Sequence, residues 1–243
     1  QADEIEKFVM EPGLSNIIRE THGKSLFFSS DLNSIIEGTD AIFLCLPTPS
    51  NLDGSTNLTY FDAAAEALAQ ILAKRKDKRR IVITSKSTVP IKTVRRLESI
   101  MKKGGVENFG VASNPEFLAE GTAVDQARRP DRVVVGCDHE EDFKILRRVY
   151  SQFVNHVRIK YIETTPETAE AIKYVANTML LTYISFWNGV GAKLGEKISN
   201  VNIDDLRMGV TADDRISTWG SFVSNGAGGS CFGKDIASLI YQL

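Results

Sequence analysis

The sequence has no apolar run of the ~18 residues that a membrane span requires, and Gln1 to Met10 lacks the basic and apolar regions of a signal peptide. It has no excess of positive charge either, because 29 Lys and Arg stand against 31 Asp and Glu, for a net charge of -2. Without a basic field, the chain is not expected to bind nucleic acid. We therefore expect a soluble, cytoplasmic protein with neither nucleic-acid nor membrane partners.

Cysteine is scarce. The three cysteines, Cys45, Cys137 and Cys231, are widely spaced, and none belongs to a CxxC pair or to a cysteine–histidine set with the spacing of metal ligands. An odd number of isolated cysteines argues against a disulfide framework and against a zinc site. No metal site is predicted, and one of the thiols is a candidate nucleophile.

The sequence also lacks the GxGxxG turn with which a dinucleotide-binding sheet usually holds the cofactor's pyrophosphate. The nearest pattern, formed by Gly189, Gly191 and Gly195, has the spacing GxGxxxG and lies within a helical segment. We interpret these glycines as sites of close helix packing.

What the sequence does contain is an alternating α/β pattern. Its 243 residues, 42% of them hydrophobic, suffice for one large or two modest domains. Apolar runs rich in β-branched residues alternate with helical segments, which is typical of parallel strands covered on both faces. The predicted strands are Ser25–Phe28, Ala41–Leu46, Ile81–Ser85, Phe109–Ala112, Arg132–Gly136 and Arg158–Ile162, and the predicted helices are Tyr60–Lys74, Ile91–Lys103 and Glu140–Phe153.

The pattern changes after Pro166, where the strands stop and Glu167 to about Gly195 predicts one long helix. We therefore divide the chain into residues 1–165, an incomplete Rossmann-like parallel sheet, and residues 166–243, a helical region built on the long central helix. Apolar residues surround that helix, so we expect a second surface to be buried in a homodimer or a higher homo-oligomer.

Two loops at predicted strand ends are candidates for chemistry, because α/β folds bind ligands there. In Asn114–Gly121, Glu116 and Glu120 place two carboxylates four residues apart; the alternative is an exposed turn. Ser87–Pro90 supplies hydroxyls after Ile81–Ser85; the alternative is that it only caps the next helix.

Two further segments lie in the helical region. Glu170, Lys173 and Asn177 fall on one face of the long helix, where the amine and the amide project together or the three form an ordinary polar stripe. Cys231 follows a glycine-rich loop and begins a helix, where the helix dipole favours the thiolate. Cys45 and Cys137 fit buried or structural positions in strands.

Four segments carry a resemblance to a known family. They are NPEFLAEGTAV from Asn114, PDRVVVG over Pro130–Gly136, AEAIKYVANTML over Ala169–Leu180, and GGSCFGKD over Gly228–Asp235. In order and spacing the chain resembles the UDP-glucose/GDP-mannose dehydrogenase family, from Glu11 to its last residue. Two family parts lie outside the resemblance: the N-terminal GxGxxG unit and the C-terminal nucleotide-sugar domain.

The resemblance implies an NAD-dependent four-electron oxidation of UDP-glucose to UDP-glucuronate, in which Cys231 forms a thiohemiacetal and then a thioester. Lys173 and Asn177 would stabilise the oxyanion, Asp235 would position water, and Glu116 would act as the acid/base. The implied catalytic set is Cys231, Lys173, Asn177, Asp235, Glu116 and Thr88.

The resemblance also implies binding residues. Those matching cofactor contacts are Leu46, Pro47, Thr48, Pro49, Ser50, Ser87, Val89, Glu120 and Lys234. Those matching contacts to the nucleotide sugar are Glu116, Phe117, Leu118, Glu120, Lys173, Asn177, Arg215 and Gly228. Arg215 would reach the substrate across the dimer, and Thr88 would share the positioning of water with Asp235.

Departures from the family pattern keep alternatives open. Gly220-Ser221 and Ala227 replace larger apolar residues expected near the nucleotide sugar. The same chemistry on GDP-mannose or a UDP-acetamido sugar is therefore an alternative, although PDRVVVG disfavours it. An inactive fragment that serves as a dimerisation scaffold is an alternative of a different class.

Overall fold

The computed structural model describes residues 9–243, which form two compact units. The first contains the chain up to Thr48 together with Asn57–Ala171, and the second contains Pro49–Thr56 and Ile172–Leu243. Within the described residues, no helix is long and apolar enough to cross a lipid bilayer. The predicted division between residues 165 and 166 stays a prediction.

The elements follow one another along the chain as far as the structure describes it. They are α2 (Leu14–Thr21), η1 (Leu32–Ser34), β1 (Ala41–Leu44), α3 (Thr59–Leu72), β2 (Ile81–Ser85), α4 (Thr93–Lys103), β3 (Phe109–Ser113), α5 (Ala123–Arg128), β4 (Arg132–Gly136), α6 (Glu140–Val149), α7 (Ser151–Val154), β5 (Lys160–Thr164), α8 (Pro166–Phe186), the π-helical turn η2 (Trp187–Gly191), α9 (Ala192–Lys197), α10 (Ile203–Thr211) and α11 (Ser230–Gln242).

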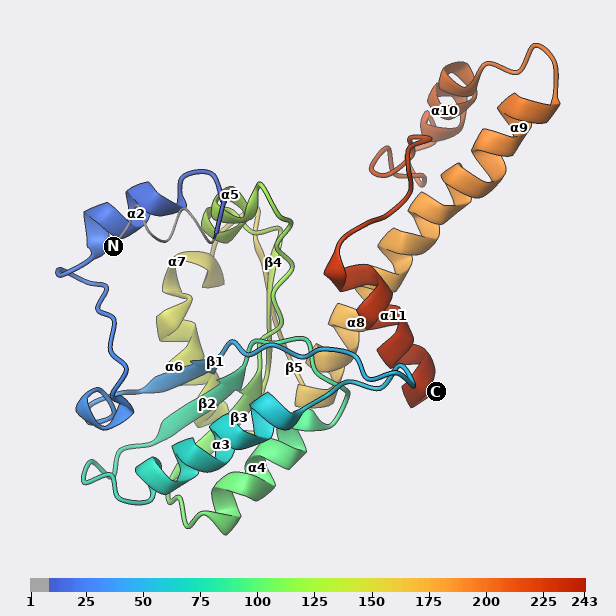
Figure 1. Ribbon diagram of the computed structural model, residues 1–243. Coiled ribbons are helices and arrows are strands. Elements are labelled where there is room, and N and C mark those ends of the chain that lie inside the picture. The colour runs from blue at the N-terminus through green and yellow to red at the C-terminus, as the bar shows by residue number, and fades with distance from the viewer. Residues whose placement is uncertain (1–8) are drawn as a thin grey trace. The chain divides into compact units, whose positions relative to one another are not determined.

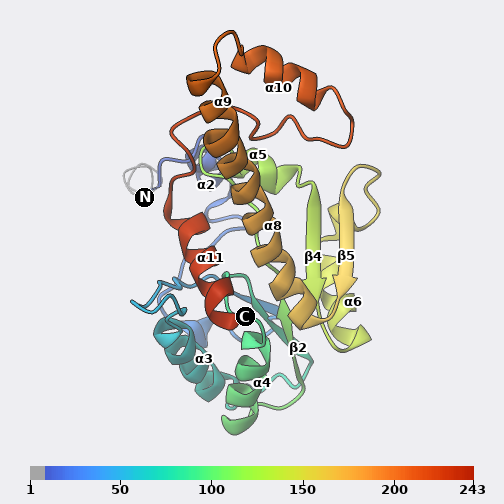
Figure 2. The ribbon, with the colours of Figure 1, turned by 90° about the vertical axis from the view of Figure 1, so that its right-hand side faces the viewer.

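The first unit is built on one sheet with the strand order β1-β2-β3-β4-β5 (Figure 1). β1, β2 and β3 pair in parallel, with Ala41 beside Val82. β4 and β5 also pair in parallel, with Arg132 beside Lys160, and Figure 2 shows them side by side. The predicted α/β class is thereby confirmed.

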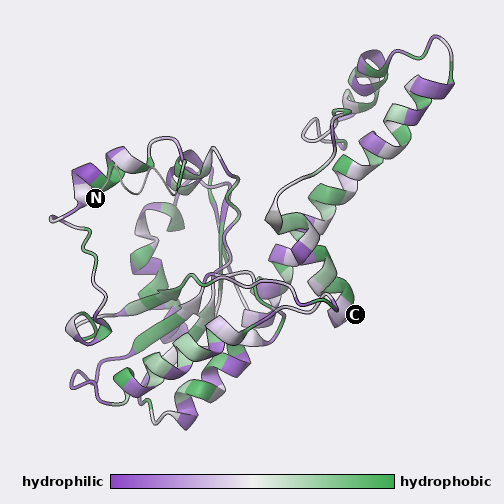
Figure 3. Ribbon diagram, viewed as in Figure 1, coloured by the Kyte–Doolittle hydropathy of each residue, from purple (hydrophilic) through white to green (hydrophobic). Residues whose placement is uncertain are grey.

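Successive strand residues enter two different apolar clusters, because side chains of a strand point alternately to its two faces. Ile81 and Ile83 pack with α3 and α4, and Val82 packs with α6 and α7. β3 repeats the alternation with Val111 and Ala112. Both faces of the sheet are thus covered, which explains the apolar runs of β1 and β2, drawn largely in green in Figure 3.

The sequence pattern predicts an entirely parallel sheet, and this prediction is wrong at one pair of strands. β3 and β4 meet in an antiparallel pair through Ser113 and Gly136. A parallel step needs a crossover helix packed on the sheet. The connection here contains only the short α5, and none of its residues enters either apolar cluster. The chain therefore turns back, and Asn114 runs beside β4, donating from Nδ2 to the carbonyl of Val134 at 2.7 Å.

The predicted strand Ser25–Phe28 is wrong. This segment makes one isolated bridge, between His22 and Leu26, and belongs to no strand. Phe27 and Phe28 are exposed. A four-residue extended segment is not stable without a neighbouring strand and a surface on which to bury its side chains, and here it has neither.

The predicted helix Glu140–Phe153 is two helices, α6 and α7, separated at Tyr150. The backbone of Tyr150 leaves the helical region, with φ -98° and ψ 23°. Its ring lies 6.4 Å, centroid to centroid, from the rings of Phe43, Phe153 and Tyr161. Packing of this ring in the core outweighs the local helix propensity, which the sequence pattern alone reflects.

The predicted long helix Glu167–Gly195 is α8, the π-helical turn and α9 in succession. The interpretation of its glycines as packing sites is confirmed at two positions. A Cβ atom on Gly191 would lie 2.9 Å from the Trp187 ring, and one on Gly195 would lie 2.6 Å from Ile203. In the second unit, α11 lies beside α8 (Figure 2).

Candidate active site

The two predicted cofactor segments of the first unit lie together at the carboxyl ends of β1 and β2. Ser87 Oγ accepts a hydrogen bond from the backbone N–H of Leu46 at 2.7 Å and donates to the Leu46 carbonyl at 2.8 Å. Thr48 Oγ1 donates to the carbonyl of Thr88 at 2.9 Å. Val89 is buried in the apolar cluster. The parallel pairing of β1 with β2 brings these loops to one edge, as the sequence pattern predicts.

The glutamate loop lines a cavity of about 350 Å³ in the first unit. Glu116 is half-buried, and its carboxylate accepts the backbone N–H of Leu118 at 2.6 Å. The guanidinium of Arg132 stacks 3.9 Å above the Phe117 ring. Glu120 is exposed. The structure therefore distinguishes the two predicted carboxylates, since only Glu116 faces this cavity.

A buried polar network behind this loop was missed by the sequence analysis. Asn114, 1% exposed, accepts at Oδ1 from Lys86 Nζ at 2.9 Å and from the hydroxyl of Tyr150. Burial raises the pKa of Tyr150 to about 12, so that its hydroxyl stays protonated and donates. Lys86 and Asn114 follow β2 and β3 directly, and this position at a strand end is a signal that could have found them.

The second unit holds the predicted helix-borne groups. Asn177 Nδ2 donates to Asp235 Oδ2 at 2.5 Å, and Lys234 Nζ donates to Asp235 Oδ1 at 2.8 Å. Lys173, Asn177 and Asp235 are 5%, 8% and 1% exposed. A buried carboxylate needs such charged and hydrogen-bonding partners. The structure thus joins Asn177 of α8 to Asp235, which lies 58 residues further along the chain, and Asp235 to its neighbour Lys234.

Cys231 is the second residue of α11. Its side chain is exposed and Cys137 is buried, as expected, but the predicted burial of Cys45 in a strand is wrong, because β1 ends at Leu44 and the Cys45 side chain is exposed. Asp235 follows Cys231 by four positions, so the two side chains share one side of α11. Gly229, which precedes the helix with φ +83°, adopts a conformation that suits glycine.

Glu170 departs from the expected polar face of the long helix. Its carboxylate accepts the backbone N–H groups of Lys92 at 2.6 Å and Val94 at 2.9 Å, at the start of α4 in the first unit. α4 has no capping side chain of its own. Burial raises the pKa of Glu170 to about 7, although the two N–H donors oppose this shift.

Two other residues predicted to bind the substrate, Arg215 and Gly228, form no hydrogen bond or ion pair with Asn177, Asp235 or Lys234 within the part of the chain that the structure describes. Arg215, whose side chain is 88% exposed, forms an ion pair with Asp213 at 2.6 Å. Gly228 is exposed, and a Cβ atom on it would meet no atom within 4 Å. Glu116 and Thr88 belong to the first unit, and Lys173, Asn177, Cys231 and Asp235 belong to the second.

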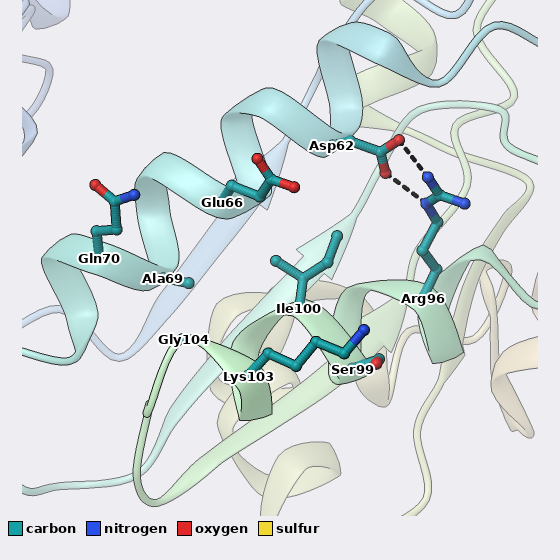
Figure 4. Close-up of a pocket in the computed structure, with 9 residues that line it drawn as sticks. All are labelled: Asp62, Glu66, Ala69, Gln70, Arg96, Ser99, Ile100, Lys103 and Gly104. Atoms are coloured by element: carbon teal, nitrogen blue, oxygen red, sulfur yellow. Dashed lines mark hydrogen bonds and ion pairs between the residues drawn. The ribbon is translucent and has the colours of Figure 1, made fainter.

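Another hollow, of about 550 Å³, lies between α3 and α4 (Figure 4). Its strongest polar contact is the two-pronged ion pair of Arg96 with Asp62, both contacts being 2.6 Å. No residue predicted for the cofactor or the substrate lines it. We do not assign it to the active site.

The sequence of the chain is similar to that of known dehydrogenases. Residues 2–154 match the NAD binding domain of the UDP-glucose/GDP-mannose dehydrogenase family, and residues 167–243 match the central domain of the same family. The UDP-glucose 6-dehydrogenase of Pseudomonas aeruginosa is 37% identical over 239 residues, which cover 96% of this chain and 51% of that protein. UDP-glucose 6-dehydrogenase 3 of Oryza sativa subsp. japonica is 36% identical over 244 residues, which cover 96% of this chain and 49% of that protein.

Solved structures give the same result. A UDP-glucose dehydrogenase from the hyperthermophilic archaeon Pyrobaculum islandicum superposes with a TM-score of 0.83 at 33% identity, covering 96% of this chain and 53% of that one. A GDP-mannose dehydrogenase from Pseudomonas aeruginosa superposes with a TM-score of 0.74 at 25% identity, with the same coverage. The chain spans about half the length of the curated relatives it matches.

Proposed function

The chain belongs to the UDP-glucose/GDP-mannose dehydrogenase family, and from this membership we propose that the intact protein oxidises UDP-glucose to UDP-glucuronate with two molecules of NAD. The observation that carries the proposal is the buried hydrogen bond between Asn177 of α8 and Asp235 of α11, the helix whose second residue is Cys231. Two helices thereby present an amide, a carboxylate and a thiol, as an acyl-transfer step on a cysteine requires.

The proposed reaction proceeds through two oxidations and one hydrolysis. The sugar alcohol first loses a hydride and a proton to become an aldehyde. The Cys231 sulfur then forms a bond to the aldehyde carbon, the oxygen takes a proton, and a thiohemiacetal results. Loss of a second hydride and a proton gives a thioester. Water then adds to the carbonyl carbon, the carbon–sulfur bond breaks, and the acid and the free thiol are released.

The residues around Cys231 are proposed to stabilise charge in this sequence. Lys173 supplies a positive charge for the oxyanion. An amide nitrogen carries two N–H groups, and Asn177 needs only one of them for Asp235. Asp235 and Thr88 would orient the attacking water, and Glu116 would accept its proton. Arg215 is proposed to contact the substrate in a dimer.

NAD, when bound, takes up the hydride of each oxidation. The loops Leu46–Ser50 and Ser87–Val89, at the carboxyl edge of the sheet, are proposed to hold it, together with Glu120 and Lys234. One observation supports the fit. Ser85 Oγ, at the end of β2, is buried and has no hydrogen-bond partner within the part of the chain that the structure describes. A ligand or water commonly satisfies such a group.

Substrate choice is tested with a panel of nucleotide sugars. The intact protein and NAD are incubated with UDP-glucose, GDP-mannose and a UDP-acetamido sugar, and NADH and acid are quantified. We expect UDP-glucose to have the highest kcat/KM, with two NADH released per acid. A higher kcat/KM for either other sugar would assign the alternative substrate. No turnover with any sugar would favour the dimerisation scaffold.

We also propose that the protein forms a homodimer through α8. Val175, Met179 and Phe186 are each more than half exposed and lie on one face of this helix. An apolar face of this kind usually marks an association surface. Trp187, another apolar residue of the predicted long helix, is buried within the chain and is not part of this face. Sedimentation should show a dimer at micromolar concentration, and Val175→Glu with Met179→Glu should give a monomer.

A further inference from the structure

The segment Pro49–Thr56, which begins within the proposed cofactor turn Leu46–Ser50, forms a closed hairpin in the second unit. Ser50 and Thr56 make an antiparallel bridge, and the Asn51 N–H donates to the Ser55 carbonyl at 2.8 Å. Asp53 Oδ1 accepts from both the N–H and the hydroxyl of Ser55, at 2.9 and 2.6 Å. These short contacts fix the shape of the hairpin without help from a neighbouring strand.

The hairpin rests on α11, the helix of Cys231 and Asp235. A Cβ atom on Gly54 would lie 3.5 Å from both the Cβ and the carbonyl oxygen of Ala237, so the tip of the hairpin packs against the helix backbone. Gly54 also has φ +88°, a conformation that other residues rarely adopt.

A chain of hydroxyls then joins the hairpin to both helices of the second unit. Thr56 Oγ1 lies 2.8 Å from Ser238 Oγ, which lies 3.1 Å from the hydroxyl of Tyr174. Gln242 Nε2 donates to Ser238 Oγ at 3.2 Å. A serine hydroxyl offers one donor and two acceptor positions, so these three partners saturate Ser238. Ser238 and Tyr174 are 1% and 0% exposed.

These linked hydroxyls lie one helical turn from Asn177 and Asp235, the proposed catalytic pair. Tyr174 precedes Asn177 by three residues on α8, and Ser238 follows Asp235 by three residues on α11. The two helices are therefore joined twice, by Tyr174–Ser238 and by Asn177–Asp235. A shift of α11 along its axis would break both connections, because hydrogen bonds tolerate little change in length.

The other end of the same segment is held by the cofactor loops of the first unit. Leu46 and Thr48 bond to Ser87 and Thr88, and Pro49 follows directly in the chain. A restraint on Leu46–Ser50 therefore passes through the covalent chain into the hairpin. Alanine in place of Ser238 and phenylalanine in place of Tyr174 would occupy nearly the same volume without a buried hydroxyl. Packing alone therefore does not require the two hydroxyls, and we assign them to the alignment of the helices.

We infer that Thr56, Ser238 and Tyr174 are positioning residues, which transmit occupation of the cofactor turn to α11 and so align Asp235 and Cys231 for reaction. The inference rests on the proposed function, because it takes Leu46–Ser50 as an NAD contact. It assigns the hairpin a role in coupling the cofactor to the thiol.

The test uses the intact protein with Ser238→Ala, Thr56→Val and Tyr174→Phe. Thr182→Val is the matched control, because among the described residues the Thr182 hydroxyl bonds only to the Thr178 carbonyl of its own helix, at 2.8 Å. Two quantities are measured for each variant: the Kd of NAD by calorimetry, and the rate of Cys231 alkylation by iodoacetamide with and without saturating NAD. The second quantity gives a ratio of rates that depends on coupling and not on turnover.

We expect NAD to change the alkylation rate of the wild-type protein and of Thr182→Val equally. In Ser238→Ala the factor by which NAD changes the alkylation rate, whether it is an increase or a decrease, should move at least about fivefold closer to one. This is the loss expected for one hydrogen bond. The Kd of NAD should stay within about threefold, and kcat should fall while the KM for NAD holds. Should Ser238→Ala fail to fold, Thr56→Val, which changes a half-buried residue, gives the same comparison.

A wild-type ratio in all three hydroxyl variants would overturn the inference, because direct shielding of the thiol by NAD needs none of these hydroxyls. NAD binding without any effect on wild-type alkylation would overturn it as well and would leave the proposed function standing. No NAD binding by the wild-type protein would instead overturn the proposed function, and the inference with it.

Discussion

The two units of the chain differ in the kind of side chain that they mostly bury. In the first, most of the buried residues are apolar, and Ile81, Ile83, Val94, Leu97 and Met101 of β2 and α4 are at most 1% exposed. In the second, Tyr174 and Trp187 are the buried apolar residues within the part that the structure describes. Its other buried side chains are polar, and they include Lys173, Asn177, Ser221, Asp235 and Ser238.

This difference indicates that the first unit mainly stabilises the fold and that the second unit mainly carries the proposed catalytic groups. Apolar burial on both faces of the sheet stabilises the first unit, which supplies rigid strand ends for binding loops. The second unit has few buried apolar residues, and it buries a lysine, an amide and a carboxylate, each of which costs free energy to desolvate. Its apolar residues Met179 and Ile240 are exposed. We infer that the second unit is arranged for catalysis and association, and that its apolar surface is covered by another copy of the chain.

The largest expected effect is at Cys231 in the second unit. Cys231→Ser should abolish net oxidation to the acid, because a hydroxyl is a poor nucleophile without an activating base. Acid formation is followed by chromatography of the reaction mixture. Cys45→Ser, which changes another exposed cysteine, should keep wild-type turnover. Acid production by Cys231→Ser at the wild-type rate would remove this residue from the mechanism.

The next effect concerns the buried lysine. Lys173→Ala should lower kcat by ~10²-fold or more and change the KM for the nucleotide sugar much less, because the charge that it stabilises develops during the reaction. Steady-state kinetics separate the two constants. A raised KM with an unchanged kcat would make Lys173 a binding residue.

Stability should follow the first unit. Leu97→Ala, at a fully buried position, should lower the free energy of unfolding by about 2–5 kcal/mol. Met179→Ala, at a position 64% exposed, should change it by at most about 0.5 kcal/mol in the monomer. Urea unfolding followed by circular dichroism measures both. Equal losses would contradict the contrast between the units.

A smaller, pH-dependent effect is expected at Glu170. Burial raises its pKa from 4.5 to about 7 in the folded state, so the folded protein binds this proton more tightly than the unfolded chain. The resulting stabilisation is complete below about pH 4.5 and is lost as the pH rises through about 7. Relative to Glu170→Gln, the wild-type free energy of unfolding should fall by on the order of 2–3 kcal/mol between pH 5 and pH 8. A difference that is constant with pH would contradict the shift.

The sequence pattern predicts the sheet best where burial decides it. β2 and β4 begin and end at the predicted residues, Ile81–Ser85 and Arg132–Gly136, because both lie between covered faces. The pattern fails where a distant contact decides the structure. Tyr150 ends α6 through its ring contacts, and the segment Ser25–Phe28 lacks the neighbour that would make it a strand.

The candidate site shows the same division. Motif order locates Lys173, Asn177, Cys231 and Asp235, but the sequence does not show that Asp235 bonds to Asn177 across two helices. Neither does it show that Glu170 caps α4, since the spacing of α8 places it on the face of Lys173. These contacts depend on tertiary packing, which local periodicity does not record.

The central claim is that Cys231 carries the substrate covalently, and mass spectrometry of the intact protein tests it most directly. The protein is mixed with UDP-glucose and NAD, quenched in acid within one turnover and digested. We predict that the peptide containing Cys231 gains the mass of a UDP-glucuronyl thioester, and that Cys231→Ser yields no such adduct. Acid product formed at the normal rate while this peptide stays unmodified, or an adduct on Cys45 or Cys137, would contradict the claim.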